Sequence, residues 1–239
     1  MTATGFGNIN AMVYTLIQAP LQNVGGSAPS IILGIFLCQL FWWFGVHGTS
    51  LLAAIWMPVL MPLSIENLAA YNAGQVLPNL FNFDTFTIAM CGGTGATLGL
   101  AFALAFLSRS KQYKTMGRLA FVPSIFGVNE PLLFGLPICL NTRMFIPWIL
   151  VPTGMTALGC LLTSIGIVEP MNGLHLQGIP SLIAMWIYMG PGGGIFNIVV
   201  CVVSGVVYWA FFKKIDDEAY EAEQRDSQKP VHESATEVA

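Results

Sequence analysis

The sequence carries very little charge. Only 9% of its 239 residues are Asp, Glu, Lys or Arg, less than half the usual share of a soluble domain, while 55% are hydrophobic. Residues 1–108 contain no Lys or Arg and only two carboxylates, Glu66 and Asp84. No soluble surface of that size is so bare of charge. The composition excludes an ordinary soluble globule and predicts an all-α integral membrane protein, a multi-span helical bundle.

The sequence also lacks the motifs of metal, phosphate and nucleic-acid chemistry. Its five cysteines stand singly in apolar stretches, with no CxxC pair and no histidine at ligand spacing, so neither a metal site nor a disulfide framework is predicted. The glycine runs at 91–99 and 190–194 match no phosphate-binding pattern and are interpreted as close-packing or hinge positions. No catalytic triad, HExxH helix or nucleic-acid patch is found. A self-contained soluble enzyme is not supported, and we expect no cofactor and no nucleic-acid partner.

Four apolar blocks are long enough to cross a bilayer, which takes about 20 residues. These blocks run over residues 31–63, 83–107, 144–168 and 181–212. The first is too long for one straight span and is interrupted at GVHG, Pro58 and Pro62, which predicts a helix, a break near His47 and a second helix. The N-terminus lacks the basic and apolar regions of a cleavable signal peptide, so insertion is expected to depend on internal segments.

A fifth apolar block, residues 119–140, is cut by prolines, by glycines and by the polar pair Asn129 and Glu130 in the stretch FGVNEPLLFG. An uninterrupted helix there would lose backbone hydrogen bonds that lipid cannot replace, so we predict a broken or re-entrant segment buried in protein. The fold class is therefore a helical bundle with two broken or re-entrant hairpin segments. Paired interruptions in a membrane protein indicate a substrate cavity, and here one carries His47 and the other Glu130.

The basic residues favour one orientation. They lie in the loop at 108–118, at Arg143 and at residues 213–214, and the positive-inside rule places all three on the cytoplasmic face. Residues 119–142 must then leave and return on the same side, as a hairpin does. The connections at 64–82 and 169–180 have no basic residue and are predicted outside.

The charges of the C-terminal end are crowded into KKIDDEAYEAEQRDSQKP, a composition typical of disorder. We therefore divide the chain into residues 1–212, a transmembrane substrate-binding portion, and residues 213–239, a charged cytoplasmic tail that is expected to be disordered.

Glu130 is the leading functional candidate. A charge near mid-membrane costs roughly 2.5–3.5 kcal/mol, which favours a functional reading over a carboxylate that caps a broken helix. Its oxygens can accept hydrogen bonds from sugar hydroxyls or take a proton. A lone carboxylate without a basic partner fits a neutral polyol better than an anion.

Two further side chains at the first break are candidates. His47 can donate or accept a hydrogen bond at neutral pH, and the companion break favours function over a satisfied structural histidine. Trp42 offers a flat face to a sugar ring, although tryptophans also collect at membrane interfaces for amphipathic reasons alone. His175 and Glu169 are interpreted as solvated or turn residues, with a role in substrate access as the lesser option.

The stretches FGVHGTSLLAAIWMPVL and PSIFGVNEPLLFGLPICLN resemble the membrane (IIC) component of phosphotransferase-system (PTS) sugar transporters of the lactose, cellobiose and diacetylchitobiose family. The NEP motif is the most specific element, and the resemblance runs from about Gly7 to Ile215. It implies a permease in the bacterial cell membrane, with its C-terminus cytoplasmic, that transports a disaccharide with coupled phosphorylation.

The resemblance also implies roles and partners. Glu130 and His47 would act catalytically near the sugar's 6-hydroxyl, with Asn129 and Trp42 as additional substrate-binding residues. The phosphoryl donor would be a cysteine of a cytoplasmic IIB component, with a IIA component as a further cytoplasmic partner.

Family chains are longer, so we expect this one to correspond to a C-terminal half, without the part similar to the scaffold that forms the family's homodimer. Two alternatives stay open: an ion-coupled secondary sugar transporter with Glu130 as the proton site, and an inactive truncated permease fragment. Which sugar is carried cannot be read from the sequence.

Overall fold

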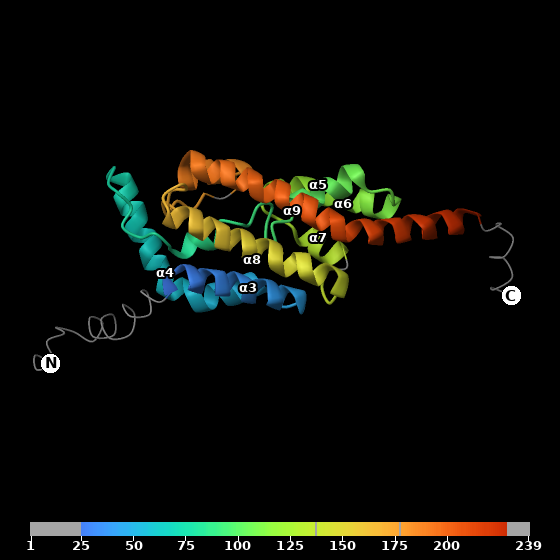
Figure 1. Cartoon of the computed structure of the whole chain (residues 1–239), viewed down its shortest axis with the longest axis horizontal. Helices are drawn as coiled ribbons and strands as arrows, with labels where there is room; N and C mark the ends of the chain where they lie inside the picture. Colours follow the sequence, from blue (N-terminus) through green and yellow to red (C-terminus); the bar gives the residue numbers. More distant parts are fainter. Residues whose placement is uncertain (1–24, 137, 177, 229–239) are drawn as a thin grey trace, which may run out of the picture.

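The computed structural model describes residues 25–136, 138–176 and 178–228, so the predicted absence of a signal peptide falls outside the described residues. Over these ranges the chain forms helices and no strand (Figure 1). The elements in chain order are α3 (Ala28–Trp43), α4 (Gly48–Asn72), the 3₁₀ helix η2 (Phe83–Thr87), α5 (Leu98–Leu107), α6 (Lys111–Ile125), α7 (Glu130–Gly135), α8 (Thr142–Ser164) and α9 (Ser181–Gln228).

Three of the described helices, α4, α8 and α9, are long and apolar enough to cross a membrane. Apolar side chains of all the long helices meet in one core, in which α3 packs on α8 while α5 packs on both α6 and α9. The all-helical architecture and these helices agree with the predicted membrane bundle.

The break in the first apolar block lies where it was predicted. α3 ends at Trp43 and α4 begins at Gly48, with His47 as the residue that caps α4. The predicted interruption at Pro58 and Pro62 is wrong, because α4 continues through both. Each proline removes a single backbone donor, a loss that helices of membrane proteins tolerate where neighbouring groups compensate.

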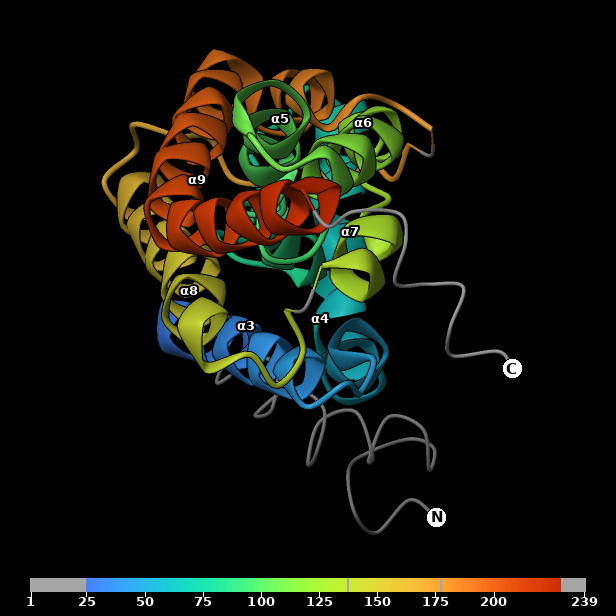
Figure 2. The ribbon, with the colours of Figure 1, turned by 90° about the vertical axis from the view of Figure 1, so that its right-hand side faces the viewer.

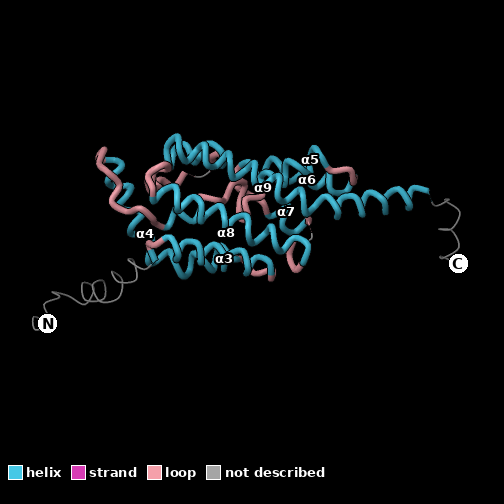
Figure 3. The backbone as a smooth tube through the Cα atoms, viewed as in Figure 1, coloured by secondary structure: helices cyan, strands magenta, loops and turns pink. Residues whose placement is uncertain are grey.

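The block at 83–107 is not one span, which corrects the prediction. After η2 the chain runs without regular structure until α5 begins at Leu98. Gly92, Gly93 and Gly95 in this segment have φ between +78° and +99°, which a right-handed helix cannot contain. Figure 3 shows this non-helical segment in the middle of the bundle, with helices around it.

The block at 119–140 is broken as predicted. α6 ends at Ile125, a turn follows over residues 126–129, and α7 restarts the helix at Glu130. The prediction that this segment begins and ends on the same side agrees with the ion pairs at its two ends. Arg109, before α6, pairs with Asp217 (3.1 Å), and Arg143, after α7, pairs with the adjacent Glu218 (2.7 Å).

The two segments without basic residues, 64–82 and 169–180, also meet each other, although α4 continues into the first and ends only at Asn72. The side-chain amides of Asn67 and Asn82 both donate to the carbonyl oxygen of Met171, over 2.8 Å and 2.9 Å. These connections lie toward the end of the bundle opposite the charged part of α9 (Figure 1). The bundle therefore has one end rich in charge and one end held by neutral amides.

The predicted disorder from residue 213 is wrong for residues 213–228, which continue α9 as a helix. Figure 2 shows this last part of α9 crossing the end of the bundle. Asp216 accepts hydrogen bonds from the Ser108 hydroxyl and from the backbone N–H groups of Arg109 (2.8 Å) and Ser110 (3.2 Å). These tertiary bonds stabilise a segment whose composition alone is typical of disorder; residues 229–239 lie outside the described residues.

Candidate functional site

A cavity of about 370 Å³ lies where the two breaks, the glycine-rich segment and the α8–α9 connection meet. Its size is within the range of small-molecule sites, roughly 300–1,000 Å³. All four residues singled out from the sequence line it: Trp42, His47, Asn129 and Glu130. Residues far apart in the chain are thus brought to one site.

His47 is held in a defined orientation at the first break. Its Nδ1 accepts from the backbone N–H of Ser50 (3.1 Å) and lies 2.8 Å from the Ser50 hydroxyl. A nitrogen that accepts a backbone N–H carries no proton, so the proton of the neutral ring is on Nε2. The cap of α4 therefore leaves Nε2–H as the group that the exposed His47 ring can present to a ligand.

Trp42 supports His47 as well as lining the cavity. The two ring centroids are 4.3 Å apart, and the indole N–H donates to the Thr49 hydroxyl over 3.1 Å. The Trp42 side chain is buried, so only part of its surface borders the cavity. Its contacts indicate that Trp42 positions His47, and the contact with a sugar that the family resemblance implies stays a prediction.

Asn129 has a structural task that the sequence did not reveal. Its amide nitrogen donates to the carbonyl oxygen of Thr94 (2.6 Å) and to the hydroxyl of Thr97 (2.7 Å). Both N–H groups are therefore used in tying the turn before α7 to the glycine-rich segment. For a ligand this leaves the side-chain oxygen, so Asn129 acts mainly by fixing the wall of the cavity.

Glu130 follows directly as the first residue of α7, with an exposed side chain that borders the cavity. Because the Glu130 side chain is exposed, its carboxylate can bind a ligand without first breaking contacts with buried neighbours. The adjacent buried amide fixes the backbone that carries Glu130, which keeps the carboxylate at the cavity wall.

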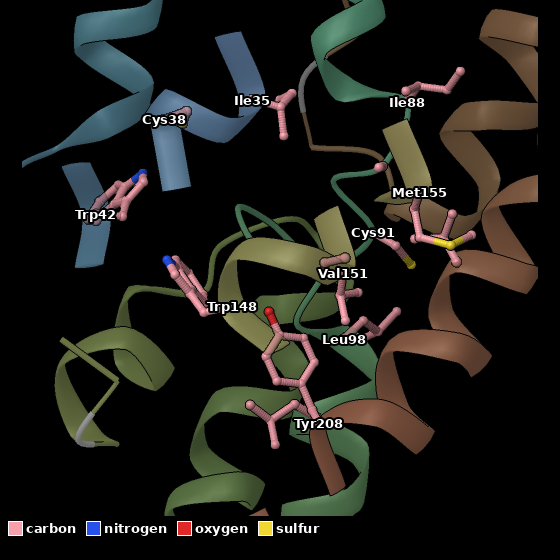
Figure 4. Packing of buried hydrophobic residues seen from close by; sticks show 14 of the residues in the cluster. Ile35, Cys38, Trp42, Ile88, Cys91, Leu98, Trp148, Val151, Met155 and Tyr208 are labelled. Carbon is pink, nitrogen blue, oxygen red and sulfur yellow. The ribbon is translucent and has the colours of Figure 1, made fainter. Parts of the chain in front are cut away.

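The glycine-rich segment forms another wall and has no room for larger residues. A Cβ on Gly93 would lie 2.7 Å from the side-chain oxygen of Asn129, and one on Gly95 would lie 2.4 Å from the Trp148 ring. The hydroxyl of Tyr208 donates to the carbonyl oxygen of Gly95 over 2.7 Å. Figure 4 shows Trp148 and Tyr208 pointing toward this region from α8 and α9. The core thus fixes the backbone of the cavity wall.

Two side chains in the cavity were missed or undervalued from the sequence. Nε2 of His175 lies 3.0 Å from Oδ1 of Asp84, and both residues border the cavity. One signal was present in the sequence, since Asp84 is one of only two carboxylates in residues 1–108. The contact between Asp84 and His175 joins two segments that are far apart in the sequence, so no local sequence pattern indicates it.

The remaining polar groups of the cavity are neutral hydroxyls, from Thr49, Thr87, Thr94, Ser181 and Tyr188. Together with the apolar surface of Met90, Leu174 and Met185, they suit a ligand that has many hydroxyl groups and also C–H faces. Over the described ranges no group of three His, Cys, Asp or Glu side chains is placed to hold a metal ion.

The comparisons with protein families, with other sequences and with solved structures agree with one another. The family described as "Phosphotransferase system, EIIC" matches residues 2–152. The chain is 33% identical over 214 residues to the "PTS system oligo-beta-mannoside-specific EIIC component" of Bacillus subtilis (strain 168), which covers 87% of this chain and 48% of that protein. It is 31% identical over 225 residues to the "PTS system lactose-specific EIICB component" of Lacticaseibacillus casei, covering 93% of this chain and 39% of that protein.

Among solved structures, the transporter ChbC, the IIC component from the N,N'-diacetylchitobiose-specific phosphotransferase system, matches with a TM-score of 0.87 and 31% identity. The match covers 93% of this chain and 52% of that chain. The chain therefore spans about half the length of the oligo-beta-mannoside component and of the solved transporter.

Proposed function

The chain belongs to the EIIC family of the phosphotransferase system, whose members are integral membrane proteins, and from this premise we propose that it binds a disaccharide and takes part in its coupled transport and phosphorylation. The sugar class is that of β-linked disaccharides such as cellobiose, lactose and N,N'-diacetylchitobiose. The names of its relatives, which specify oligo-beta-mannosides, cellobiose, lactose and N,N'-diacetylchitobiose, support this choice.

One observation carries the proposal: Glu130 of the NEP motif and His47 of the GVHG motif, 83 positions apart in the sequence numbering, line one cavity. In the reaction that we propose, the sugar's 6-hydroxyl oxygen attacks the phosphorus of a phosphocysteine. The O–P bond forms as the S–P bond breaks, the cysteine leaves as thiolate, and the hydroxyl proton passes to Glu130. His47 donates from Nε2 to the same hydroxyl oxygen and orients it.

The phosphocysteine is assigned to a cytoplasmic IIB component, which is phosphorylated by IIA. A relative named as an EIICB component, in which the two parts share a name, supports this partner. We place residues 1–212 as the substrate-binding portion and the charged end of the bundle, with the C-terminus, on the cytoplasmic side. The exposed or half-exposed side chains of Lys111, Lys114 and Arg118, spaced three and four residues apart on α6, would attract an acidic or phosphorylated partner.

The test is sugar uptake into vesicles that contain a complete permease built with this chain. Phosphoenolpyruvate with the soluble PTS components should drive uptake of a disaccharide and yield the sugar phosphate. Uptake driven by a pH gradient, with unmodified sugar inside, would instead support an ion-coupled transporter. Absence of sugar binding by the purified chain, with and without a supplied N-terminal half, would support an inactive fragment.

A further inference from the structure

We propose that His175 is a second sugar-binding residue of the cavity, oriented by Asp84 as its positioning residue, and that it binds the ring of the disaccharide that does not receive the phosphoryl group. The inference rests on the proposed function, because it concerns the same cavity and the same class of ligand. It adds a residue pair that determines whether one ring or two rings are recognised.

The geometry of the pair defines what His175 can do. Its Nε2 lies 3.0 Å from Oδ1 of Asp84, whose side chain is only 7% exposed, whereas the His175 side chain is 48% exposed. A carboxylate oxygen is an acceptor, so Nε2 carries the proton and donates it. In the neutral ring Nδ1 is then an acceptor, on a side chain that borders the cavity. A sugar hydroxyl is a suitable donor for it.

A purely structural role does not explain why this pair contains a charge. The α8–α9 connection that carries His175 is already held by neutral groups. Asn172 donates from its side chain to the carbonyl oxygen of Ile187 (2.7 Å), and the Tyr188 hydroxyl bonds both the N–H (3.1 Å) and the carbonyl oxygen (3.0 Å) of Leu176. Burial of a carboxylate costs desolvation, and a buried ion pair is on balance a poor source of stability. The specific effect of Asp84 is to fix the tautomer and direction of the imidazole.

The position of the pair fits a ligand with two rings. Glu130 and His47 come from the breaks after α6 and α3, whereas Asp84 and His175 come from η2 and the α8–α9 connection. The cavity therefore carries two sets of titratable side chains on walls built from different elements. Apolar neighbours of His175, namely Leu174, Leu176 and Ile179, supply surface for the C–H face of a sugar ring.

The experiment measures binding of a disaccharide and of its single-ring unit to the purified chain by titration calorimetry. The pairs are cellobiose with glucose, lactose with galactose, and N,N'-diacetylchitobiose with N-acetylglucosamine, and the pair used is the one that the unmodified chain binds. His175→Ala should weaken disaccharide binding about five- to tenfold, the effect of one hydrogen bond, and leave binding of the single ring unchanged. His175→Gln, which keeps an acceptor, should recover part of the loss and serves as the variant of choice if His175→Ala fails to fold.

Asp84 is tested through His175. Asp84→Asn keeps an oxygen that accepts from Nε2–H and should retain most of the affinity, whereas Asp84→Ala should lose as much as His175→Ala. The double variant Asp84→Ala/His175→Ala should lose no more than either single variant, because both remove one interaction. Equal losses for one ring and two rings, or no loss in His175→Ala, would overturn the inference. If the unmodified chain binds neither the disaccharide nor its single ring, the proposed function itself fails. That result differs from a failure of the inference alone, in which the unmodified chain binds sugar but His175→Ala causes no selective loss.

Discussion

The side-chain amide of Asn129 donates to the carbonyl oxygen of Thr94 over 2.6 Å and so joins the broken helix before Glu130 to the glycine-rich segment at the centre of the bundle. Two pieces of backbone without helical hydrogen bonds thereby support each other inside a membrane protein. This relationship explains how an irregular segment is maintained beside the cavity where lipid would not tolerate it.

Replacing Asn129 by Asp should destabilise the protein by about 1–3 kcal/mol, because a carboxylate oxygen would replace the donor that faces the Thr94 carbonyl and the Thr97 hydroxyl. Thermal unfolding of the purified protein in detergent measures the loss. Asn141→Asp is the matched control, since Asn141 caps α8 by accepting from the N–H of Arg143, a task that Asp performs equally well. Equal melting temperatures for both variants would refute the assigned role.

Gly95→Ala should cost about 1–2 kcal/mol for its φ of +78° alone, and more because the new methyl group would lie 2.4 Å from the Trp148 ring. Gly154→Ala in α8 meets nothing within 4 Å and should be neutral or slightly stabilising. Denaturation in detergent compares the two variants. A Gly95→Ala protein as stable as Gly154→Ala would contradict the packing described for the cavity wall.

Glu223 ties the end of α9 to the start of α6. Hydrogen bonds from the Ser110 hydroxyl and from the backbone N–H groups of Lys111 and Gln112 hold the pKa of the Glu223 carboxyl below its ordinary value of 4.5. A folded-state pKa below the unfolded one stabilises the contact above pH 4.5, and the effect is lost as the pH falls through the lowered pKa.

Amide hydrogen exchange should therefore show that residues 216–226 lose protection as the pH is lowered below about 4.5, the ordinary pKa of Glu. Glu223→Gln should weaken protection at neutral pH and reduce this pH dependence. Glu221→Gln is the control, because Glu221 pairs only with Arg225 on its own helix among the described ion pairs. Identical exchange profiles for Glu223→Gln and the unmodified chain would argue against the contact.

Charge reversal on α6 should separate partner docking from sugar binding. Lys114→Glu/Arg118→Glu is expected to slow phosphoryl transfer from a phosphorylated IIB protein by about tenfold at low salt, with a smaller effect at high salt, and to leave sugar affinity unchanged. Arg225→Glu reverses one cation on α9, half the change in net charge, and controls for charge reversal away from α6. An unchanged rate of phosphoryl transfer in Lys114→Glu/Arg118→Glu would show that these two cations are not part of the docking surface.

The sequence was most informative where residue chemistry is local. Glycine and proline weaken a helix through their own backbone chemistry, so clusters of them with polar residues allowed the breaks at His47 and Glu130 to be predicted to within a few residues. The same rule failed at Pro58 and Pro62, because α4 continues through both prolines although each removes one backbone N–H donor.

Segments stabilised by tertiary contacts could not be predicted. Residues 88–97 lie within the apolar block 83–107, which is long enough for a span, and hydropathy does not distinguish a span from a loop enclosed by helices. The glycines at 92, 93 and 95 were the available signal for the loop. The helical end of α9 depends on hydrogen bonds that Asp216 and Glu223 accept from the α5–α6 loop and the start of α6, more than 100 positions earlier in the chain. The Asp84–His175 pair is likewise visible only once the connections meet.

The most direct test of the account is the affinity of the purified chain for a disaccharide before and after Glu130→Gln, with Glu66→Gln as the matched control. Glu66 is an exposed carboxylate that accepts from Asn79 and does not line the cavity. Loss of hydrogen bonds to a charged acceptor, worth about 1.5–3 kcal/mol, predicts a roughly ten- to hundredfold weaker affinity for Glu130→Gln and an unchanged affinity for Glu66→Gln. Undiminished binding by Glu130→Gln would contradict the placement of the sugar at this cavity.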